Sequence, residues 1–327
     1  MAADQSRLAG LITGFRVTPA LYVAAVLGVA DLLTDGARTS DALAAETDTD
    51  PDALYRLLRA LATVGVFEEQ PGRRFALTDL GDGLRSDVEG SLRPQVLYLG
   101  RPHQWNVWTD LLYSVRTGTS AFEHQHGESA WAYRAQRPEE SALFDDWMTT
   151  MTRSTNATIV AGYDFSRFAH VVDVGGGHGA FLTAILDASP ETTGTLFDQE
   201  HVVATAPPHP RLQVVGGSFF DSVPGGGDAY VLKSIVHDWP DAEATAILRN
   251  CAAALGDRGS VLLVERDLND PTSVWLDLQM LVMFGARERT ADEYARLFEA
   301  AGLRYVDATK VEGGWAVYQG AATSPSR

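Results

Sequence analysis

The sequence has almost no cysteine, no evident membrane-length apolar run and no leader-like start, and each shortage excludes a class of protein. Its 327 residues include a single cysteine, Cys251, so no disulfide can form within the chain, and we interpret Cys251 as a small core residue. No apolar run approaches the length needed to cross a bilayer. Residues 1–5 lack the basic and then apolar order of a signal peptide. We therefore expect a cytoplasmic protein.

Positive charge is also scarce. The chain has 26 Lys and Arg against 43 Asp and Glu, which gives a formal net charge of −17. Such a chain would repel a phosphate backbone unless a basic face were strongly segregated, and we find no such face. We expect no nucleic-acid or membrane partner, and a small molecule as the ligand. His124 and His126 lie in a loop-like stretch without a carboxylate cluster at metal-ligand spacing, so we predict no metal.

The first quarter of the chain predicts three helices followed by a β-hairpin, which is the order of elements in a winged helix. The helices begin at capping residues, and a Pro-Gly turn separates the two strand-like runs of the hairpin. The predicted helices cover residues 19–33, 39–46 and 53–64, and the hairpin covers residues 66–77.

A winged helix raises the hypothesis of DNA binding. Arg56, Arg59, Arg73 and Arg74 could then contact phosphates. The alternative is that these arginines are solvated edges of a domain used for packing. We favour the alternative, because four basic residues are few beside so acidic a chain.

The segment from Arg101 to Tyr163 is rich in aromatic residues. Most of these side chains are expected to pack the N-terminal domain against the remainder of the chain. Some should line a pocket for a planar, apolar ligand, since aromatic and Met side chains suit such a molecule. The predicted pocket residues, with two from a later helix, are Trp105, Phe144, Met148, Met280 and Phe284.

From His170 onward, strand-like and helix-like runs alternate. This alternation predicts an α/β domain with a doubly wound, Rossmann-like and largely parallel sheet, whose ligand site lies at the carboxyl ends of the strands. The predicted strands cover residues 170–174, 194–197, 212–215, 229–232 and 260–265, with a final pair near 303–308 and 315–319.

A glycine cluster follows the first of these strands, in Val174-Gly175-Gly176-Gly177-His178-Gly179. Glycine lets a ligand approach the backbone amides and the N-terminus of the following helix. The spacing fits the dinucleotide fingerprint, and Asp198 at the end of the next strand could accept both ribose hydroxyls. These features suit NAD and S-adenosylmethionine equally. Asp173 is acidic where dinucleotide-binding strands are usually apolar.

Four motifs in order carry a specific resemblance: residues 172–177 (VDVGGG), 216–220 (GGSFF), 230–241 (YVLKSIVHDWPD) and 276–281 (LDLQML). Together they closely resemble the S-adenosylmethionine-dependent O-methyltransferases of the plant caffeate type and their bacterial natural-product relatives. The resemblance covers nearly the whole chain. It implies a winged-helix dimerisation domain over residues 1–95, a methyltransferase domain over residues 96–327, and a homodimer.

The resemblance also implies how the cofactor is held. Gly175 and Gly177 would lie under the methionine moiety, and Asp198 would hold the ribose. The remaining contacts would come from Ser218 and Phe219 beside the adenine, from Lys233 beside the ring or the sulfonium, and from Arg153, which matches an arginine that pairs with the cofactor carboxylate in some bacterial relatives. The family often has Asp where this chain has Ser218, which weakens that contact.

His237 corresponds to the general base of the family, and Glu265 and Glu288 correspond to its two orienting glutamates. A phenol and an imidazole differ by about 3.5 pKa units, roughly 5 kcal/mol if the proton moved first. Proton transfer must therefore accompany attack on the methyl group. We expect transfer of a methyl group to a hydroxyl of an aromatic specialised metabolite.

Three other readings stay open. Members of this family have drifted to C- or N-methylation and to non-methylating chemistry, although retention of His237, Glu265 and Glu288 favours the ordinary reaction. A ligand-sensing transcription factor built on the winged helix is a non-enzymatic alternative. An NAD-dependent dehydrogenase is the weakest of the three.

Overall fold

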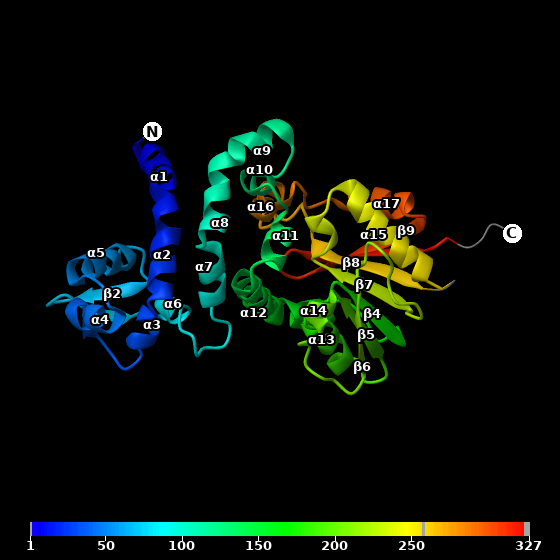
Figure 1. Ribbon diagram of the computed structural model, residues 1–327, viewed down its shortest axis with the longest axis horizontal. Coiled ribbons are helices and arrows are strands. Elements are labelled where there is room, and N and C mark those ends of the chain that lie inside the picture. The colour runs from blue at the N-terminus through cyan, green and yellow to red at the C-terminus, as the bar shows by residue number, and fades with distance from the viewer. Residues whose placement is uncertain (1, 257–258, 324–327) are drawn as a thin grey trace. The chain divides into compact units, whose positions relative to one another are not determined.

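The computed structural model describes residues 2–256 and 259–323, and the chain divides into two compact units (Figure 1). The first unit contains the residues up to Asn106 together with Arg137–Thr150, and the second contains Val107–Gln136 and Met151–Arg327. Each unit has its own buried apolar core.

The first unit begins with the predicted winged-helix elements. The Thr39 side chain accepts from the N–H of Ala42 at 3.2 Å and caps α4 (Ser40–Thr47). Asp50 caps α5 (Pro51–Ala62) in the same way, with Pro51 in the first turn. The small sheet has the order β1-β3-β2. The elements are α2 (Val17–Val26), α3 (Val29–Leu32), β1 (Arg38–Thr39), α4 (Ser40–Thr47), α5 (Pro51–Ala62), β2 (Phe67–Gln70), β3 (Arg74–Leu77) and α6 (Asp79–Asp82).

Two expectations for this region are wrong. The helix predicted over residues 19–33 is broken, because Gly28 adopts a left-handed backbone with φ +64° between α2 and α3. The expectation that no apolar run approaches membrane length is also wrong. The stretch Gln5–Val26 begins within α1 (Ala2–Thr13) and continues through η1 (Gly14–Arg16) and α2. This run of 22 residues reaches a mean hydropathy of 1.4, long and apolar enough to cross a membrane by length and composition. Small residues interspersed among the apolar ones hide this run from a simple search for apolar blocks.

The N-terminal helical run exposes apolar side chains. Only 11% of its most apolar window is buried, and the exposed fractions are 70% for Leu11, 67% for Ile12 and 61% for Phe15. An exposed apolar face of this kind marks a surface that another molecule covers.

Three of the four arginines named for the winged helix contact groups of their own domain. Arg59 lies 3.6 Å from a carboxylate oxygen of Glu69, Arg73 lies over the ring of Tyr55 at 4.1 Å, and Arg74 donates to a backbone carbonyl. These contacts favour the reading of the arginines as solvated edges of a packing domain over DNA binding.

Three further helices complete the first unit: α7 (Arg93–Leu99), α8 (Pro102–Trp105) and the first half of α12 (Pro138–Gly162). The ring of Tyr98 on α7 packs against Phe144 and Trp147 of α12, with centroids 5.4 and 5.0 Å apart.

The second unit is built on a seven-stranded sheet with the order β6-β5-β4-β7-β8-β10-β9. The first five strands are parallel, and β10 runs antiparallel to both β8 and β9. The strands are β4 (His170–Val174), β5 (Thr193–Asp198), β6 (Leu212–Gly216), β7 (Ala229–Lys233), β8 (Ser260–Arg266), β9 (Leu303–Val311) and β10 (Trp315–Ala322).

Helices cover both faces of this sheet. One face packs against α15 (Asp241–Ala254) and α17 (Ala291–Ala300) through residues such as Ile247 and Phe298. The other face packs against α13 (Ala180–Ala188) and the end of α12 through Leu182 and Ile159. This confirms the doubly wound α/β class. The remaining helices of the unit are η2 (Asn106–Asp110), α9 (Leu111–Thr117), α10 (Ala121–His126), α11 (Ala130–Ala135), α14 (Glu200–Val203), η3 (Val236–Asp238) and α16 (Val274–Phe284).

Candidate functional site

The glycine turn joins β4 to α13 and leaves open space where a side chain would otherwise stand. Gly175, Gly177 and Gly179 have φ values of +74°, +59° and +81°. A Cβ on Gly175 would lie 2.6 Å from Cδ1 of Ile235, whereas a Cβ on Gly177 would meet nothing within 4 Å. The turn therefore needs glycine for its backbone, and at Gly177 it presents that backbone to free space.

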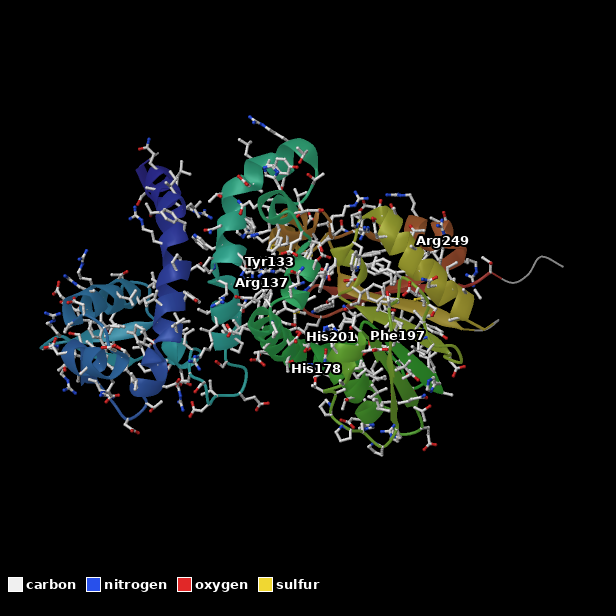
Figure 2. The ribbon with its side chains drawn as sticks, in the orientation of Figure 1. Tyr133, Arg137, His178, Phe197, His201 and Arg249 are labelled. Carbon is white, nitrogen blue, oxygen red and sulfur yellow. The ribbon has the colours of Figure 1, made fainter. Side chains whose placement is uncertain are left out.

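Asp198 lies beside this turn, as the sequence predicts. Its Oδ2 accepts from the N–H of Gly177 at 2.9 Å, and its Oδ1 accepts from the N–H of Gln199 at 2.7 Å. The neighbouring residue on β5, Phe197 (Figure 2), accepts at its carbonyl from the N–H of Gly175 at 2.8 Å. Burial raises the pKa of Asp198, while the two backbone bonds oppose that change.

Asp173 is buried one residue before the end of β4. Among the residues that the structure describes, its Oδ2 is a buried oxygen with no hydrogen-bond partner. Burial raises its pKa to about 7, although the charge of Lys233 acts in the opposite direction. A buried oxygen without a partner next to an open backbone turn fits a site that receives a polar ligand such as an adenosyl group.

Lys233 ends β7 at the same edge of the sheet. Its Nζ lies 4.9 Å from the ring centre of Trp315 and 5.7 Å from that of Phe181. Burial lowers the pKa of this amine to about 8, against the pull of Asp173 and Glu265. The lysine thus lies between aromatic faces and near the buried carboxyl of Asp173.

Phe219 follows β6 and approaches the turn, because its Cε1 would lie 3.5 Å from a Cβ on Gly175. The preceding hydroxyl, that of Ser218, accepts from the N–H of Phe220 at 3.2 Å. The side chain of Arg153 on α12 lies outside the described part of the structure.

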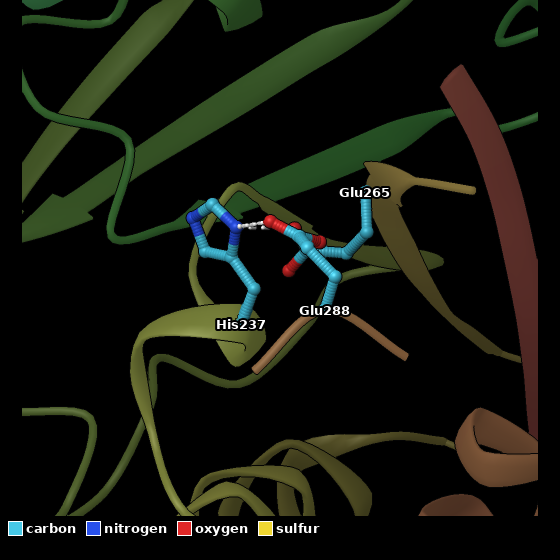
Figure 3. A group of neighbouring side chains, drawn as sticks. All are labelled: His237, Glu265 and Glu288. Carbon is cyan, nitrogen blue, oxygen red and sulfur yellow. Dashed lines mark hydrogen bonds and ion pairs between the residues drawn. The ribbon is translucent and has the colours of Figure 1, made fainter. Parts of the chain in front are cut away.

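His237 lies in the short helix η3 after β7 and forms a tight pair with Glu288 (Figure 3). Its Nδ1 is 2.6 Å from Oε1 of Glu288 and 3.8 Å from Oε2 of Glu265. All three side chains are buried, with exposed fractions of 7% for His237, 1% for Glu288 and 0% for Glu265. The sequence-predicted triad is therefore assembled, with Glu288 as the direct partner of the imidazole.

Glu265 has a second task. It lies near the end of β8, and its Oε1 accepts from the backbone N–H groups of Val236 at 2.8 Å and of Ile235 at 3.2 Å. Burial raises its pKa to about 7, with opposition from His237. Glu265 thus holds the backbone that leads into η3, while Glu288 holds the ring.

Glu288 is positioned by its own loop. Gly285 ends α16 with φ +63°, and the N–H of Glu288 donates to Oδ1 of Asp277 at 2.9 Å. Thr290 then begins α17 with a capping box that includes Glu293. The carboxylate is therefore fixed from both ends of a short connection.

The electrostatics of His237 follow from these neighbours. Burial alone would lower the pKa of the imidazole, but Glu288, Glu265 and Asp238 together hold the pKa well above its ordinary value of 6.5. Nε2 lies 3.5 Å from Oδ1 of Asp238. An imidazole in this setting binds a proton strongly and keeps Nδ1 turned to Glu288.

The three donor atoms of His237, Glu265 and Glu288 lie within 4.8 Å of one another and could in principle hold a cation. The 2.6 Å separation of Nδ1 and Oε1 is a hydrogen-bond length. Two tetrahedral zinc ligands would lie roughly 3.3 Å apart. This geometry favours a proton between the two atoms, and the absence of a metal stays a prediction.

The residues predicted for the acceptor pocket form two sets. Trp105, Phe144 and Met148 belong to the first unit, whereas Met280 and Phe284 belong to α16 in the second. Their joint role stays a prediction. The loop expected around His124 and His126 is wrong, because both residues lie in the last turn of α10. His124 stacks on Tyr113 with centroids 3.8 Å apart, so this histidine belongs to an aromatic contact.

Sequence reasoning missed an aromatic stack beside the triad. Trp131 of α11 stacks on Trp239 at 6.0 Å and on Phe284 at 5.4 Å, and the guanidinium of Arg134 lies 4.2 Å from the ring centre of Trp131. Burial raises the pKa of Asp238 to about 6, although the charges of His237 and Arg134 act in the opposite direction. The i, i+3 spacing of Trp131 and Arg134 on one helix was the available signal.

Comparison with known proteins places the chain in a family. An O-methyltransferase domain model matches residues 108–304, and an O-methyltransferase dimerisation domain model matches residues 9–87. The chain is 43% identical over 309 residues to the phenazine O-methyltransferase PhzM of Lysobacter antibioticus, which covers 91% of this chain and 90% of the relative. It is 36% identical to the 8-amino-8-demethylriboflavin N,N-dimethyltransferase of Streptomyces davaonensis, over 93% of this chain and 91% of that enzyme.

A solved structure agrees with these relatives. The O-methyltransferase NcsB1 from neocarzinostatin biosynthesis, in complex with S-adenosyl-L-homocysteine and 1,4-dihydroxy-2-naphthoic acid, superposes with a TM-score of 0.84 at 36% identity. The match covers 94% of this chain and 96% of NcsB1. The chain therefore belongs to the S-adenosylmethionine-dependent O-methyltransferases of the plant caffeate type, in the group of bacterial natural-product enzymes.

Proposed function

We propose that this enzyme methylates a phenolic hydroxyl of a planar aromatic specialised metabolite and that His237 is the general base. The observation that carries the proposal is the buried 2.6 Å pair of His237 and Glu288. The triad and the glycine turn share one edge of the sheet, because Ile235 contacts the turn two residues before His237.

S-adenosylmethionine, when bound, supplies an electrophilic methyl group. The work of the chain is to align the acceptor hydroxyl and to accept its proton at Nε2 of His237. Glu288 stabilises the imidazolium through Nδ1. The pKa of a phenol lies about 3.5 units above that of an ordinary imidazole. This difference in pKa is smaller here, because the carboxyl groups around His237 raise the pKa of its imidazole.

For the cofactor, we propose that Asp198 binds the ribose hydroxyls and that the glycine turn at Gly175 and Gly177 lies against the methionine portion. Ser218 and Phe219 would flank the adenine. The proposal also includes Lys233 near the sulfonium and Arg153 at the cofactor carboxylate. Thermal stabilisation by S-adenosylhomocysteine but not by NAD is the expected result, and the opposite preference would overturn the assignment.

The acceptor is proposed from the pocket residues and from the relatives. The residues predicted for the pocket, Trp105, Phe144, Met148, Met280 and Phe284, are aromatic or sulfur-containing, which suits a flat ring system. NcsB1 was crystallised with a dihydroxynaphthoic acid, which is such a molecule. We expect fused phenolic rings to be better acceptors than aliphatic alcohols in a panel assay.

N-methylation is the alternative that a specific observation supports, because one relative is an N,N-dimethyltransferase. An aromatic amine needs less help from a base than a phenol does, so the intact His237–Glu288 pair favours oxygen as the acceptor. Transfer from methyl-labelled S-adenosylmethionine to an aminophenol distinguishes the two. Label in an aryl methyl ether supports the proposal, and label only on nitrogen overturns it.

The organisation of the protein is proposed on similar grounds. We assign residues 1–95 to dimerisation and residues 96–327 to methyl transfer. The dimerisation model covers Leu11, Ile12 and Phe15, so a second copy of the chain is the expected cover for the exposed apolar face of Gln5–Val26. We place the homodimer in the cytoplasm, as befits a biosynthetic enzyme that uses S-adenosylmethionine.

A further inference from the structure

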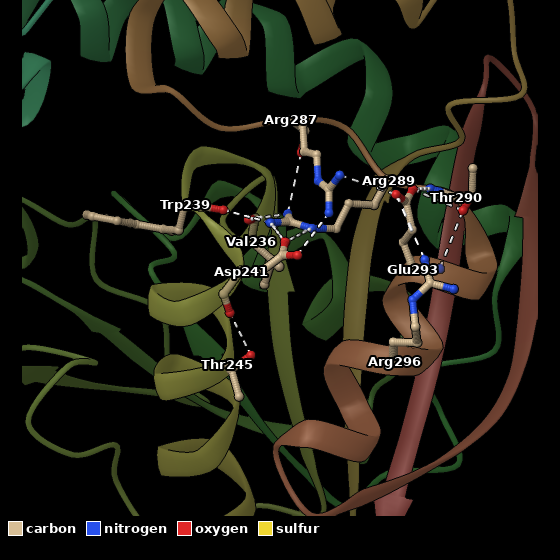
Figure 4. A network of polar contacts seen from close by, with 9 residues as sticks. All are labelled: Val236, Trp239, Asp241, Thr245, Arg287, Arg289, Thr290, Glu293 and Arg296. Atoms are coloured by element: carbon tan, nitrogen blue, oxygen red, sulfur yellow. Dashed lines mark hydrogen bonds and ion pairs between the residues drawn. The ribbon is translucent and has the colours of Figure 1, made fainter. Parts of the chain in front are cut away.

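Arg289 is a fully buried arginine that follows Glu288 in the loop between α16 and α17. Its exposed fraction is 0%. Its Nη1 donates to the carbonyl of Val236 at 2.9 Å, and its Nη2 donates to the carbonyl of Trp239 at 2.8 Å (Figure 4). The guanidinium therefore bonds to the backbone on both sides of His237 and Asp238.

The same guanidinium is anchored to Asp241. Nε and Nη2 both donate to Oδ1 of Asp241, at 3.1 and 2.8 Å. Burial would raise the pKa of Asp241, but the hydrogen bond and charge of Arg289 hold it below its ordinary value. Arg287 reaches the other oxygen, Oδ2, from a half-exposed position at 2.8 Å.

These contacts matter because η3 is only three residues long and one helical turn of this type is weakly held by itself. Glu265 binds the N–H groups at the start of the turn, and Arg289 binds the carbonyl groups at its two ends. A planar guanidinium has five donors in a fixed fork, so it can serve Val236, Trp239 and Asp241 together. A lysine cannot do so in the same geometry.

Glu288 and Arg289 are consecutive residues, and their side chains contact two parts of one unit. Glu288 contacts the imidazole ring, and Arg289 contacts the backbone that carries the ring. We infer that Arg289 is a positioning residue that fixes the His237 turn against the Glu288 carboxylate, so that the base and its partner keep their alignment during turnover. The inference rests on the proposed role of His237.

The first test is a titration that needs no acceptor. In the full-length enzyme with labelled histidine, the imidazole signal of His237 is identified by its loss in His237→Gln and followed against pH by NMR. Glu288, Glu265 and Asp238 face this ring. In Arg289→Lys the turn should drift from Glu288, and the pKa of His237 should fall by about one unit or more. Arg296→Gln on α17 is the matched control, because its side chain is 67% exposed and lies 4.0 Å from Glu293, outside the contacts of Arg289. It should leave the pKa of His237 unchanged.

Asp241→Asn provides a second route in case Arg289→Lys folds poorly, because the Asp241 side chain is 54% exposed. Asp241→Asn should also lower the pKa of His237, by a smaller amount than Arg289→Lys does. S-adenosylhomocysteine affinity, measured by calorimetry, should stay within about twofold in every variant. An unchanged His237 pKa in both Arg289→Lys and Asp241→Asn would overturn the inference.

The second test is a double-mutant cycle with 1,4-dihydroxy-2-naphthoic acid as the acceptor. Arg289→Lys should reduce kcat by up to about 100-fold with little change in KM, since misplacement of a reacting group by 1 Å has an effect of that size. In the His237→Gln background the same change should have almost no effect. If the two substitutions together reduce kcat by the product of their separate effects, Arg289 does not act through His237. If His237→Gln retains full activity, the proposed function fails, whereas the titration still decides the positioning role.

Discussion

Replacement of Glu288 by glutamine should harm catalysis far more than the same replacement at Glu265. The two carboxyl groups flank one imidazole, but only Glu288 lies at 2.6 Å from Nδ1, whereas Glu265 lies at 3.8 Å. Glu288→Gln keeps the size and an acceptor oxygen and removes the charge. The perturbation therefore isolates the stabilisation of the imidazolium that forms when His237 takes the acceptor proton.

The magnitude follows from the contact. A hydrogen bond to a charged group contributes about 1.5–3 kcal/mol, and a neutral one contributes about 0.5–1.5 kcal/mol. Their difference, about 1–2 kcal/mol, corresponds to a loss of roughly 5- to 30-fold in kcat. Glu265 differs because its Oε1 serves two backbone N–H groups, which an amide oxygen can also accept, and because burial raises its pKa to about 7. Glu265→Gln should therefore reduce kcat by less than about threefold.

The assay compares kcat for both variants at pH 7 and pH 9, with the most rapidly methylated member of a panel of dihydroxynaphthoic acids. S-adenosylhomocysteine affinity, measured by calorimetry, is the control for folding and cofactor binding. A larger loss in Glu265→Gln than in Glu288→Gln, at equal cofactor affinity, would refute the reasoning. It would mean that the short pair is not the one that carries the developing charge.

Three further predictions concern other parts of the site and fold. Only unprotonated His237 can accept a proton, and its pKa is raised, so kcat/KM should fall as the pH drops through a midpoint above 6.5. Glu288→Gln should move that midpoint to lower pH. A pH–rate profile that is flat from pH 6 to pH 9 would contradict this. Gly177→Ala should leave the protein folded, since nothing lies within 4 Å of the new methyl group. The left-handed backbone at φ +59° should lower the free energy of unfolding by about 1 kcal/mol. The variant should lose the thermal stabilisation by S-adenosylhomocysteine, and full retention of that stabilisation would place the cofactor elsewhere. Leu11→Glu with Ile12→Glu should convert a dimer to a monomer in light scattering, and an unchanged mass would show that this face is not the interface.

The sheet could be predicted because parallel strands buried on both faces are continuous apolar runs. The strand predicted over residues 229–232 is β7, Ala229–Lys233, and the strand predicted over residues 260–265 is β8, Ser260–Arg266. The final strands extend further than predicted, to Val311 in β9 and to Ala322 in β10. The last residues of the edge strand β9 alternate between exposed and less exposed positions, and β10 ends in the small residues Gly320, Ala321 and Ala322. Apolar continuity thus identifies a buried strand more sharply than an edge strand.

The N-terminal helices show the limit of composition. Gly28 splits one predicted helix, and α1 had no signal beyond scattered apolar residues. Its apolar side chains pack into no core of the described chain, and the proposed dimer interface is the reason that we give for their exposure.

The triad of His237, Glu265 and Glu288 could be predicted from motifs, but which of the two glutamates contacts the imidazole directly could not. His237 and Glu288 are 51 residues apart, and no spacing rule distinguishes a 2.6 Å partner from one at 3.8 Å. Arg289 was missed for the same reason, since its carbonyl partners at Val236 and Trp239 lie 53 and 50 residues away. An arginine beside a charged loop normally suggests solvent exposure. Only the packing shows that this one is buried.

The most direct measurement is the fate of the labelled methyl group of S-adenosylmethionine in the presence of a dihydroxynaphthoic acid, with wild-type enzyme and with His237→Gln compared at equal occupancy by cofactor. The wild-type enzyme should place the label in an aryl methyl ether, and the variant should do so at least about 100-fold more slowly. Equal rates of ether formation in the two proteins would contradict the central claim that the imidazole held by Glu288 removes the acceptor proton.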